Sequence, residues 1–249
     1  YAEADPTFDV EGIDAGHKLM ILASIAFGIP LQFDKVFTEG ITKITREDVE
    51  YAGELGYRIK HLGIARKTEQ GIELRVHPTL IPERRLIANV DGVMNAVLVQ
   101  ADAVGPTLYY GAGAGAEATA SAVIADVVDV VRALSLESAD RIPPLGFQDS
   151  AITDSNILNA EQIETAYYLR LTVEDKPGAL ADITNILAKQ NISIEAIIQK
   201  EPLQGASSLP VIMLTQKTIE KEMDTAISAI ENLSSVTGQV TRIRLETLG

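Results

Sequence analysis

The sequence predicts an α+β or α/β protein with two unequal parts. Three observations support this fold class. An N-terminal part combines helical runs with pairs of strands, which is typical of a mixed sheet with helices packed on it. Hydrophobic periodicity is then lost at residues 135–165. After this stretch, strand and helix patterns follow in the order βαββαβ, the order of a ferredoxin-like fold.

The N-terminal part, residues 1–134, begins with a strongly apolar helix. We expect it from Asp14 to Phe27, because the following Gly28 and Pro30 discourage its continuation. The next helix has Thr45 as its N-cap and an acidic residue three positions later, and reaches about Leu55. The other expected elements are a hairpin of residues 57–68 and 71–79, a strand pair of residues 95–101 and 107–110, and a helix at residues 120–134.

The C-terminal part, residues 166–249, has the clearest pattern. We interpret residues 135–165 as a linker, because Pro143 and Pro144 lie there among polar residues. In a βαββαβ sheet both helices cover one face and an edge strand is free, so we expect pairing with a second copy, as a homodimer or homotetramer. The expected elements are strand 167–173, helix 179–190, strand 192–199, strand 208–215, helix 218–233 and strand 236–245.

Composition and charge restrict the partners. The 249 residues are 46% hydrophobic, enough for a sizeable core, and carry a formal net charge of -14. Nucleic acids and anionic membranes need a basic surface, so we expect small solutes instead. Cysteine is absent, which excludes disulfides and thiolate sites. No apolar run reaches the roughly 20 residues of a membrane span, and we expect a cytoplasmic protein with further residues upstream of Tyr1.

Three charged residues near the N-terminus are the first candidates for chemistry. Asp14 and Lys18 lie one turn apart on the same helix face, and Glu3 precedes them. One interpretation is a helix cap with an ordinary i,i+4 ion pair. However, the run after Lys18 is apolar on nearly every side, as in a helix enclosed by protein. Because a buried unpaired charge is costly, this context favours a lysine that faces a polar cleft.

A glycine-rich turn precedes the last helix of the N-terminal part. Gly111, Gly113 and Gly115 alternate there with alanines. Such a turn lets backbone N–H groups approach an anion or a flat cofactor at a helix N-terminus. The spacing is not G-x-G-x-x-G, and small residues can instead serve close helix packing. Both interpretations stay open on these residues alone.

The start of the C-terminal part resembles an ACT domain, an amino-acid-binding module of metabolic enzymes. The resemblance is carried by YYLRLTVEDKPGAL at residues 167–180 and by NISI at residues 191–194. A glycine at a strand-to-helix turn also leaves backbone donors accessible to a carboxylate. The alternative is a plain tight turn that caps the helix. The effector-binding residues that the resemblance implies are Asp175, Pro177, Gly178 and Ala179.

The N-terminal part resembles the catalytic half of the homoserine dehydrogenase family. The motifs are EADP at residues 3–6, DVEGID at 9–14, HK at 17–18, GAG at 113–115 and TA at 119–120. With the ACT-like part, they resemble the bacterial, threonine-regulated form. The resemblance implies reversible, NAD(P)H-dependent reduction of L-aspartate 4-semialdehyde to L-homoserine, with threonine as the expected effector.

The resemblance also assigns roles to residues. Lys18 matches the proton-transfer lysine, Glu3 and Asp14 match substrate-binding groups, and Asp9 is a weaker substrate-binding candidate. Negative charge grows on a carbonyl oxygen as hydride reaches its carbon, and an ammonium can stabilise that charge or donate a proton. The second hypothesis is an amino-acid-binding ACT oligomerisation module with a non-functional catalytic remnant. The cofactor-binding candidates are Gly113, Ala114 and Gly115.

The histidines do not indicate a metal site. His17 lies about 100° around the helix from Lys18, so we expect it to pack or to face solvent. His61 and His77 fall in expected strands without partners at metal-ligand spacing. We therefore assign no metal.

We predict that these 249 residues alone do not oxidise homoserine. The dinucleotide fingerprint expected before the family's catalytic half is absent from them. The test is NAD(P)H formation from homoserine, followed by absorbance, with the purified chain and the full-length protein in parallel. Measurable turnover by the chain, free of full-length enzyme, would contradict this prediction.

Overall fold

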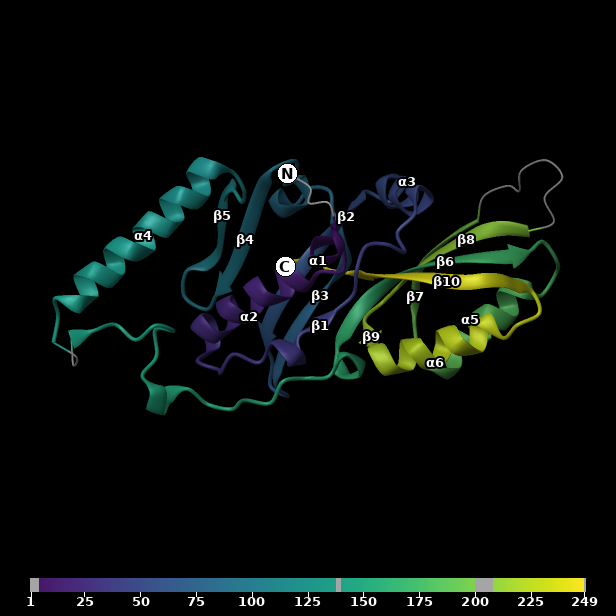
Figure 1. Ribbon diagram of the computed structural model, residues 1–249. Coiled ribbons are helices and arrows are strands. Elements are labelled where there is room, and N and C mark those ends of the chain that lie inside the picture. The colour runs from purple at the N-terminus through teal and green to yellow at the C-terminus, as the bar shows by residue number, and fades with distance from the viewer. Residues whose placement is uncertain (1–4, 138–139, 200–207, 249) are drawn as a thin grey trace.

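The computed structural model describes residues 5–137, 140–199 and 208–248. Its N-terminal half is built on a long hairpin of β2 (Tyr57–Lys67) and β3 (Ile72–Pro82), which pair antiparallel along their whole length (Figure 1). The short β1 (Phe37–Thr38) pairs parallel with β3. The other elements of this half are α1 (Thr7–Val10), α2 (Ile13–Phe27), η1 (Phe33–Lys35), α3 (Arg46–Glu54), η2 (Leu86–Asn89), β4 (Met94–Ala101), β5 (Gly105–Ala112) and α4 (Ala116–Leu134).

The C-terminal end of α2 and the start of α3 follow the capping rules that the sequence indicates. Gly28 ends α2 with φ of +64°, a left-handed backbone conformation that favours glycine. At the other end the N-cap is Gly12, with φ of +79°, so the interpretation of Asp14 as the helix cap is wrong. At α3, the Asp48 N–H donates to the Thr45 hydroxyl, and the Thr45 N–H donates to the Asp48 carboxylate. This is the capping box expected from the sequence.

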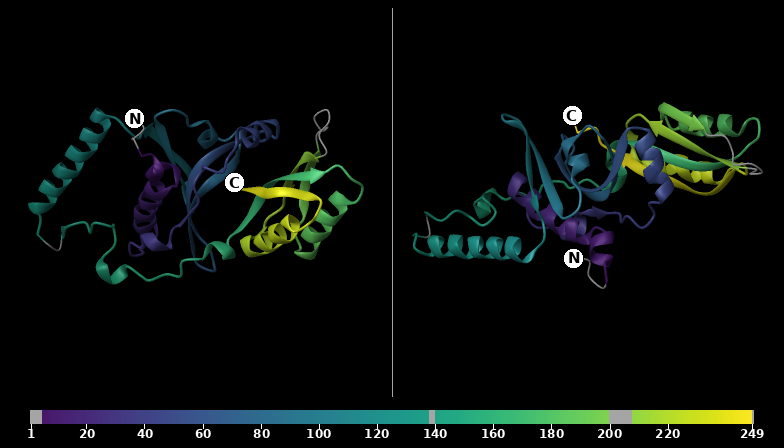
Figure 2. Two further views of the ribbon diagram at one scale, coloured as in Figure 1. Left: turned by 45° about the vertical axis from the view of Figure 1, so that its right-hand side comes forward. Right: turned by 90° about the horizontal axis from the view of Figure 1, so that it is seen from above.

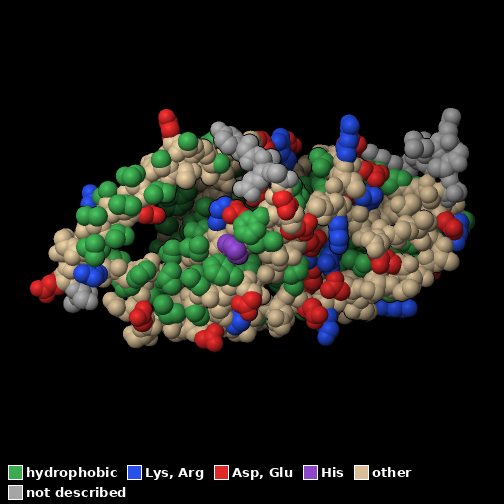
Figure 3. Space-filling view, in the orientation of Figure 1, with side chains coloured by type: hydrophobic (Ala, Val, Ile, Leu, Met, Phe, Trp, Pro, Cys, Tyr) green, Lys and Arg blue, Asp and Glu red, His purple; other side chains and the backbone are tan. Residues whose placement is uncertain are grey.

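The strands β4 and β5 form a separate two-stranded sheet, and α4 follows it. In Figures 1 and 2, α4 stands apart from the other elements. No residue of α4 is buried. The space-filling view shows apolar side chains along α4 beside an open gap (Figure 3). These exposed side chains are Val123, Ile124, Val127, Val128, Val130, Val131 and Leu134.

The C-terminal half confirms the expected βαββαβ order. Its strands run β10-β6-β8-β7 across the sheet. The expected helix at 218–233 is shorter, because Thr218 and Ile219 extend along the start of β6 as β9. The elements are β6 (Glu164–Glu174), α5 (Ala179–Lys189), β7 (Ile194–Gln199), β8 (Ser208–Thr215), β9 (Thr218–Ile219), α6 (Glu220–Glu231) and β10 (Val236–Leu245).

Both faces of this sheet are covered. Helices α5 and α6 pack on one face, where Ile183 and Met223 join a core with Leu169 and Val211. The opposite face packs against α3 of the N-terminal half through Tyr51, which belongs to a second core cluster. A third cluster lies between α2 and β3 and includes Leu19, Met20, Ala23, Leu74 and Val76.

The two halves share one eight-stranded sheet. Six strands follow the order β1-β3-β10-β6-β8-β7, while β2 pairs with β3 and β9 pairs with β6 outside this order. Strand β10 pairs parallel with β3, with Arg244 opposite Thr79. One edge of the βαββαβ sheet is therefore already covered, and β7 forms the other edge. The segment between the halves is also attached to the hairpin, since the Ile72 N–H donates to Asn156 and the Leu158 N–H donates to Ile72.

Buried ion pairs lie where β10 meets the hairpin. Arg75 is fully buried and donates to the carboxylates of Glu73 and Glu246, and Arg66 donates to Glu246 at 2.8 Å. Burial alone would raise the pKa of Glu246, but Arg75 and Arg66 hold this pKa below its ordinary value. Removing one partner of a buried ion pair leaves an unpaired charge and lowers the free energy of unfolding by about 3–5 kcal/mol. These pairs therefore tie the end of the chain to the hairpin.

The buried His77 is neutral and has a defined tautomer. The guanidinium of Arg75 lies 2.8 Å from Nε2 of His77, and since arginine only donates, Nε2 accepts. The proton therefore lies on Nδ1, which is 3.0 Å from the Pro78 carbonyl. Burial lowers the pKa of His77 well below its usual value, and the charges of Arg244 and Arg75 lower it further.

Within the described ranges, no helix is long and apolar enough to cross a membrane.

We predict that His77 makes folding sensitive to mild acid. Its pKa is lower in the folded than in the unfolded state, so the unfolded state binds the extra proton as pH falls below about 6.5. The free energy of unfolding should then fall by up to about 1.4 kcal/mol per pH unit. Urea unfolding between pH 7.5 and 5.5 measures this slope. The slope should flatten in His77→Gln and persist in His17→Gln, and an unchanged slope in His77→Gln would refute the assignment.

Candidate functional site

Helix α2 carries the predicted catalytic lysine. Lys18 donates to the carboxylate of Asp14 one turn earlier, so the i,i+4 pair that the sequence suggested is present. The Lys18 side chain is 70% exposed and that of Asp14 is 36% exposed. The helix buries Leu19 and Met20 against the hairpin on its other side. Both charged groups are therefore free to meet a ligand.

The expectation that α2 is enclosed on nearly every side is wrong for the described residues. Ile21 and Leu22 are each 44% exposed, and Ile25 is 48% exposed. The described residues consequently leave Lys18 and the apolar side chains beside it largely open to solvent. The sequence shows that α2 carries apolar side chains on nearly every side, but it does not show which part of the protein covers them.

The remaining substrate-binding candidates lie before α2. Glu3 falls outside the described residues. Asp9 is exposed on α1, and its carbonyl accepts from the Gly12 N–H at the start of α2. A Cβ at Gly12 would lie 2.9 Å from atoms of both His61 and Val76, so α2 begins in close contact with the hairpin. This contact fixes where the first turn of α2 lies.

The ring of His17 packs edge-on between two aromatic rings. The centroids lie 5.5 Å from Phe8 and 4.8 Å from Phe33. His17 thus links α1, α2 and η1 through ring contacts. In the described part of the chain, no group of three or more His, Asp or Glu side chains is arranged to hold a metal.

The glycine turn before α4 uses its small residues in two ways. A Cβ at Gly113 would lie 1.9 Å from the Asn95 amide nitrogen, so Gly113 allows a close approach of β4. Gly115 is the N-cap of α4, with φ of +128° and open space around it. No side chain caps this helix start. Its first N–H groups are therefore suited to an anion, although Glu117 in the first turn opposes negative charge.

The turn that the sequence assigned to an effector lines a cavity of about 220 Å³. Asp175, Pro177, Gly178 and Ala179 all contribute to its wall. This volume lies below the roughly 300 Å³ at which pockets for drug-sized ligands begin. Gly178 is the N-cap of α5, with φ of +95° and no side-chain cap. The cavity therefore combines a size suited to a small metabolite with an uncapped helix N-terminus.

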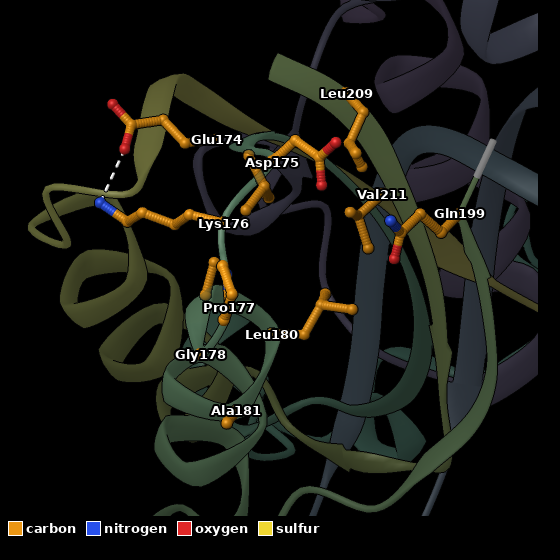
Figure 4. Close-up of a pocket in the computed structure, with 12 residues that line it drawn as sticks. Glu174, Asp175, Lys176, Pro177, Gly178, Leu180, Ala181, Gln199, Leu209 and Val211 are labelled. Carbon is orange, nitrogen blue, oxygen red and sulfur yellow. Dashed lines mark hydrogen bonds and ion pairs between the residues drawn. The ribbon is translucent and has the colours of Figure 1, made fainter. Parts of the chain in front are cut away.

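Strands β7 and β8 supply cavity residues that the sequence interpretation missed. In Figure 4, the side chains of Asp175, Leu180, Val211 and Gln199 converge, while Glu174 and Lys176 form an ion pair on the outside. Leu209 also lines the cavity, two positions before Val211 on the same face of β8. That alternation is visible in the sequence. Its position next to the turn depends on the strand order.

The lysine helix, the glycine turn and the cavity occupy different elements. Lys18 and Asp14 pair on α2, and Asp9 lies on the preceding α1. Gly113 to Gly115 lie between β5 and α4, and the cavity lies between β6, α5, β7 and β8. The sequence prediction of two functions in two halves is consistent with this separation. The roles of the individual residues stay predictions.

Comparison with known proteins gives the family of both halves. The homoserine dehydrogenase profile matches residues 1–128, and the ACT domain profile matches residues 167–234. The chain is 62% identical over 248 residues to the homoserine dehydrogenase of Pseudomonas aeruginosa and 54% identical over 248 residues to that of Neisseria gonorrhoeae. Each alignment covers 100% of the chain and 57% of the relative. The chain thus spans a little over half the length of these relatives.

Solved structures show the same relationship. A homoserine dehydrogenase from Thiobacillus denitrificans is 64% identical, with a TM-score of 0.94 over 100% of this chain and 56% of the other. A homoserine dehydrogenase from S. aureus is 28% identical, with a TM-score of 0.67 over 98% of this chain and 56% of the other. The chain belongs to the homoserine dehydrogenase family and consists of its C-terminal catalytic part followed by an ACT domain.

Proposed function

We propose that the protein containing this chain is a homoserine dehydrogenase, which interconverts L-aspartate 4-semialdehyde and L-homoserine with NAD(P)(H). The observation that carries the proposal is the Lys18–Asp14 pair, which lies on an exposed face of α2 within the residues that the family profile matches. An oxidoreductase of this class must neutralise an oxygen that becomes negative as the carbonyl is reduced. A lysine held by a carboxylate on a rigid helix supplies that group.

Lys18 is the proton donor in this proposal. When the substrate carbonyl accepts hydride, its oxygen gains an electron pair, and Lys18 transfers a proton from Nζ to that oxygen to give the hydroxyl of homoserine. In the oxidative direction the neutral amine of Lys18 takes the proton back. Asp14 orients Nζ through the observed ion pair. Glu3 and Asp9 are assigned to the ammonium group of the substrate, because carboxylates bind ammonium groups.

The cofactor is assigned to the turn of Gly113, Ala114 and Gly115. The open space at Gly115 and the uncapped start of α4 fit a phosphate group of NAD(P), since backbone N–H groups there have no side-chain acceptor. The bound cofactor supplies the hydride. The apolar faces of α2 and α4 are assigned to contact with the nucleotide-binding half, because the relatives are longer than this chain.

The ACT domain is assigned to threonine. The helix N-terminus at Gly178 suits the carboxylate of an amino acid, and the Asp175 carboxylate suits its ammonium group. Leu180, Leu209 and Val211 offer an apolar wall to a short side chain. The β7 edge of the sheet is assigned to pairing with a second copy, in a homodimer or homotetramer.

A second candidate is an amino-acid-binding oligomerisation module whose catalytic half is a remnant. One observation favours it: the described residues line a defined cavity at the turn assigned to the effector, whereas Lys18 is largely open to solvent. The two candidates differ in turnover by the full-length protein. Homoserine oxidation with a dependence on Lys18 supports the enzyme, whereas threonine binding without turnover supports the module.

We predict that Lys18→Ala in the full-length protein lowers kcat by roughly 100- to 10,000-fold, the usual contribution of a general acid or base. The fold should survive, because an exposed ion pair contributes only about 0.2–1 kcal/mol. Homoserine oxidation and thermal unfolding measure the two effects. Lys43→Ala removes another exposed lysine and should leave both unchanged. Near-normal turnover in Lys18→Ala would remove Lys18 from the mechanism.

We predict that Asp175→Asn weakens threonine binding by roughly 10- to 100-fold, because a charge-assisted hydrogen bond contributes about 1.5–3 kcal/mol. Calorimetry with threonine measures the affinity, and inhibition of turnover gives a second readout. Asp182→Asn is the matched control, since Asp182 lies in the first turn of α5 but does not line the cavity. Equal losses in both variants would indicate a general charge effect and contradict the assigned contact. No heat together with no effect on turnover at saturating threonine would count against threonine as the effector.

A further inference from the structure

The buried Arg244 contacts carboxylates of both the ACT domain and the catalytic part. Arg244 of β10 is 1% exposed. Its Nε donates to Glu220 at 2.8 Å, and its Nη1 donates to Glu39 at 2.7 Å. Its guanidinium also lies 5.0 Å from the centre of the Phe37 ring. Glu220 begins α6 of the ACT domain, whereas Glu39 follows β1 of the catalytic part. Arg244 therefore contacts both parts at once.

The ACT side of this contact reaches the core beneath the effector cavity. The Tyr167 hydroxyl donates to Glu220 at 2.9 Å. Tyr167 lies on β6, and the same strand continues to Val173, which lines the cavity. Tyr167, Val173 and Ala179 all belong to one core cluster. A ligand that shifts the turn at Asp175 to Ala179 thus acts on the cluster that holds Tyr167 and, through it, Glu220.

The catalytic side of the contact reaches the first turns of α2. The Glu39 N–H donates to Val76 of β3 at 2.8 Å, and the Glu39 carbonyl lies 2.9 Å from Nε2 of His61. The His61 ring fills the space where a side chain at Gly12 would lie. The methyl group of Thr38 similarly limits the space at Gly16. Thr38 therefore contacts the first turn of α2 at Gly16, and Glu39 reaches Gly12 through the His61 ring, so both support the turn that carries Asp14.

We propose that Glu39 and Arg244 are positioning residues, whose ion pair couples the ACT domain to the start of α2 and so sets the position of Lys18. The expected effect on turnover rests on the proposed function, whereas the expected effect on hydrogen exchange in α2 does not. The pair is suited to transmission because one guanidinium contacts both Glu220, at the start of α6, and Glu39, which follows β1. If binding of an effector to the ACT domain changes the structure around α2, then a change around α2 must also change the affinity for the effector, because coupling between two sites is reciprocal.

The variant Glu39→Gln tests the coupling with little risk to folding. Glu39 is 26% exposed, and in its absence Arg244 keeps its contacts with Glu220, so no buried charge is left unpaired. Glu50→Gln is the matched control. It removes the same charge from an exposed ion pair with Arg46 on α3, on the same part of the protein. Both variants are made in the full-length protein.

Hydrogen exchange provides a readout that does not need activity. In wild type, threonine should slow exchange both in α5 and in residues 13–20 of α2. In Glu39→Gln, residues 13–20 should exchange at least about fivefold faster, and threonine should slow α5 only. Glu50→Gln should behave as wild type. Threonine-dependent protection of α2 in Glu39→Gln equal to wild type would overturn the proposal, as would a failure of threonine to protect α2 in wild type.

Kinetics separates positioning from a purely structural role. We expect Glu39→Gln to lower kcat by at least about fivefold and to weaken inhibition by threonine, while the KM for cofactor stays unchanged. A loss of thermal stability with normal kcat and normal inhibition would overturn the proposal. If wild type itself does not oxidise homoserine, the proposed function fails, and the exchange experiment still decides whether the ion pair couples the two parts.

Discussion

The parallel pairing of β10 with β3 is the constraint on which the rest of the structure depends. It places β10, the last strand of the ACT domain, beside β3, the second strand of the hairpin in the catalytic part. The polar side chains of β3 then become buried, among them Arg75 and His77. Such groups are tolerated in the interior only when they are paired. The arginines of the junction pair with Glu73 and Glu39 of the N-terminal half and with Glu246 and Glu220 of the C-terminal half. The junction between β3 and β10 is therefore held by buried ion pairs between particular residues as well as by strand pairing.

This arrangement limits how an effector can act within one subunit. A domain on a free tether would swing, but here the connecting segment is hydrogen-bonded to Ile72, and α3 packs on the ACT sheet through Tyr51. Arg170 reinforces the same contact by pairing with the buried Asp48, at 2.6 Å. Although burial alone would raise the pKa of Asp48, Arg170 and Thr45 hold it below its ordinary value. Small shifts through packed elements are therefore the available route, which gives the contact between Glu39 and Arg244 its significance.

Local rules explain why much of the fold could be predicted from the sequence. The capping box at Thr45, the glycines flanking α2 and the βαββαβ order are all set by neighbouring residues. The shared sheet could not be predicted in this way, because pairing between β3 and β10 joins residues far apart in the chain. The polar row of β3 carries no local sign of burial, since alternation along a strand only separates its two faces. Gln199, Glu39 and Arg244 were missed for the same reason.

The exposure of Lys18 is best understood together with the apolar surface beside it. Ile21, Leu22 and Ile25 extend along α2, and α4 presents a longer apolar stripe. Exposed apolar side chains that gather along one helix face are typical of a contact with another part of a protein. A layer over α2 would remove water from Lys18 and strengthen its interaction with a developing negative oxygen, because charges interact more strongly where the dielectric constant is low. The described residues thus provide the orientation of the lysine, and in our proposal the covering layer provides the environment in which its charge becomes effective.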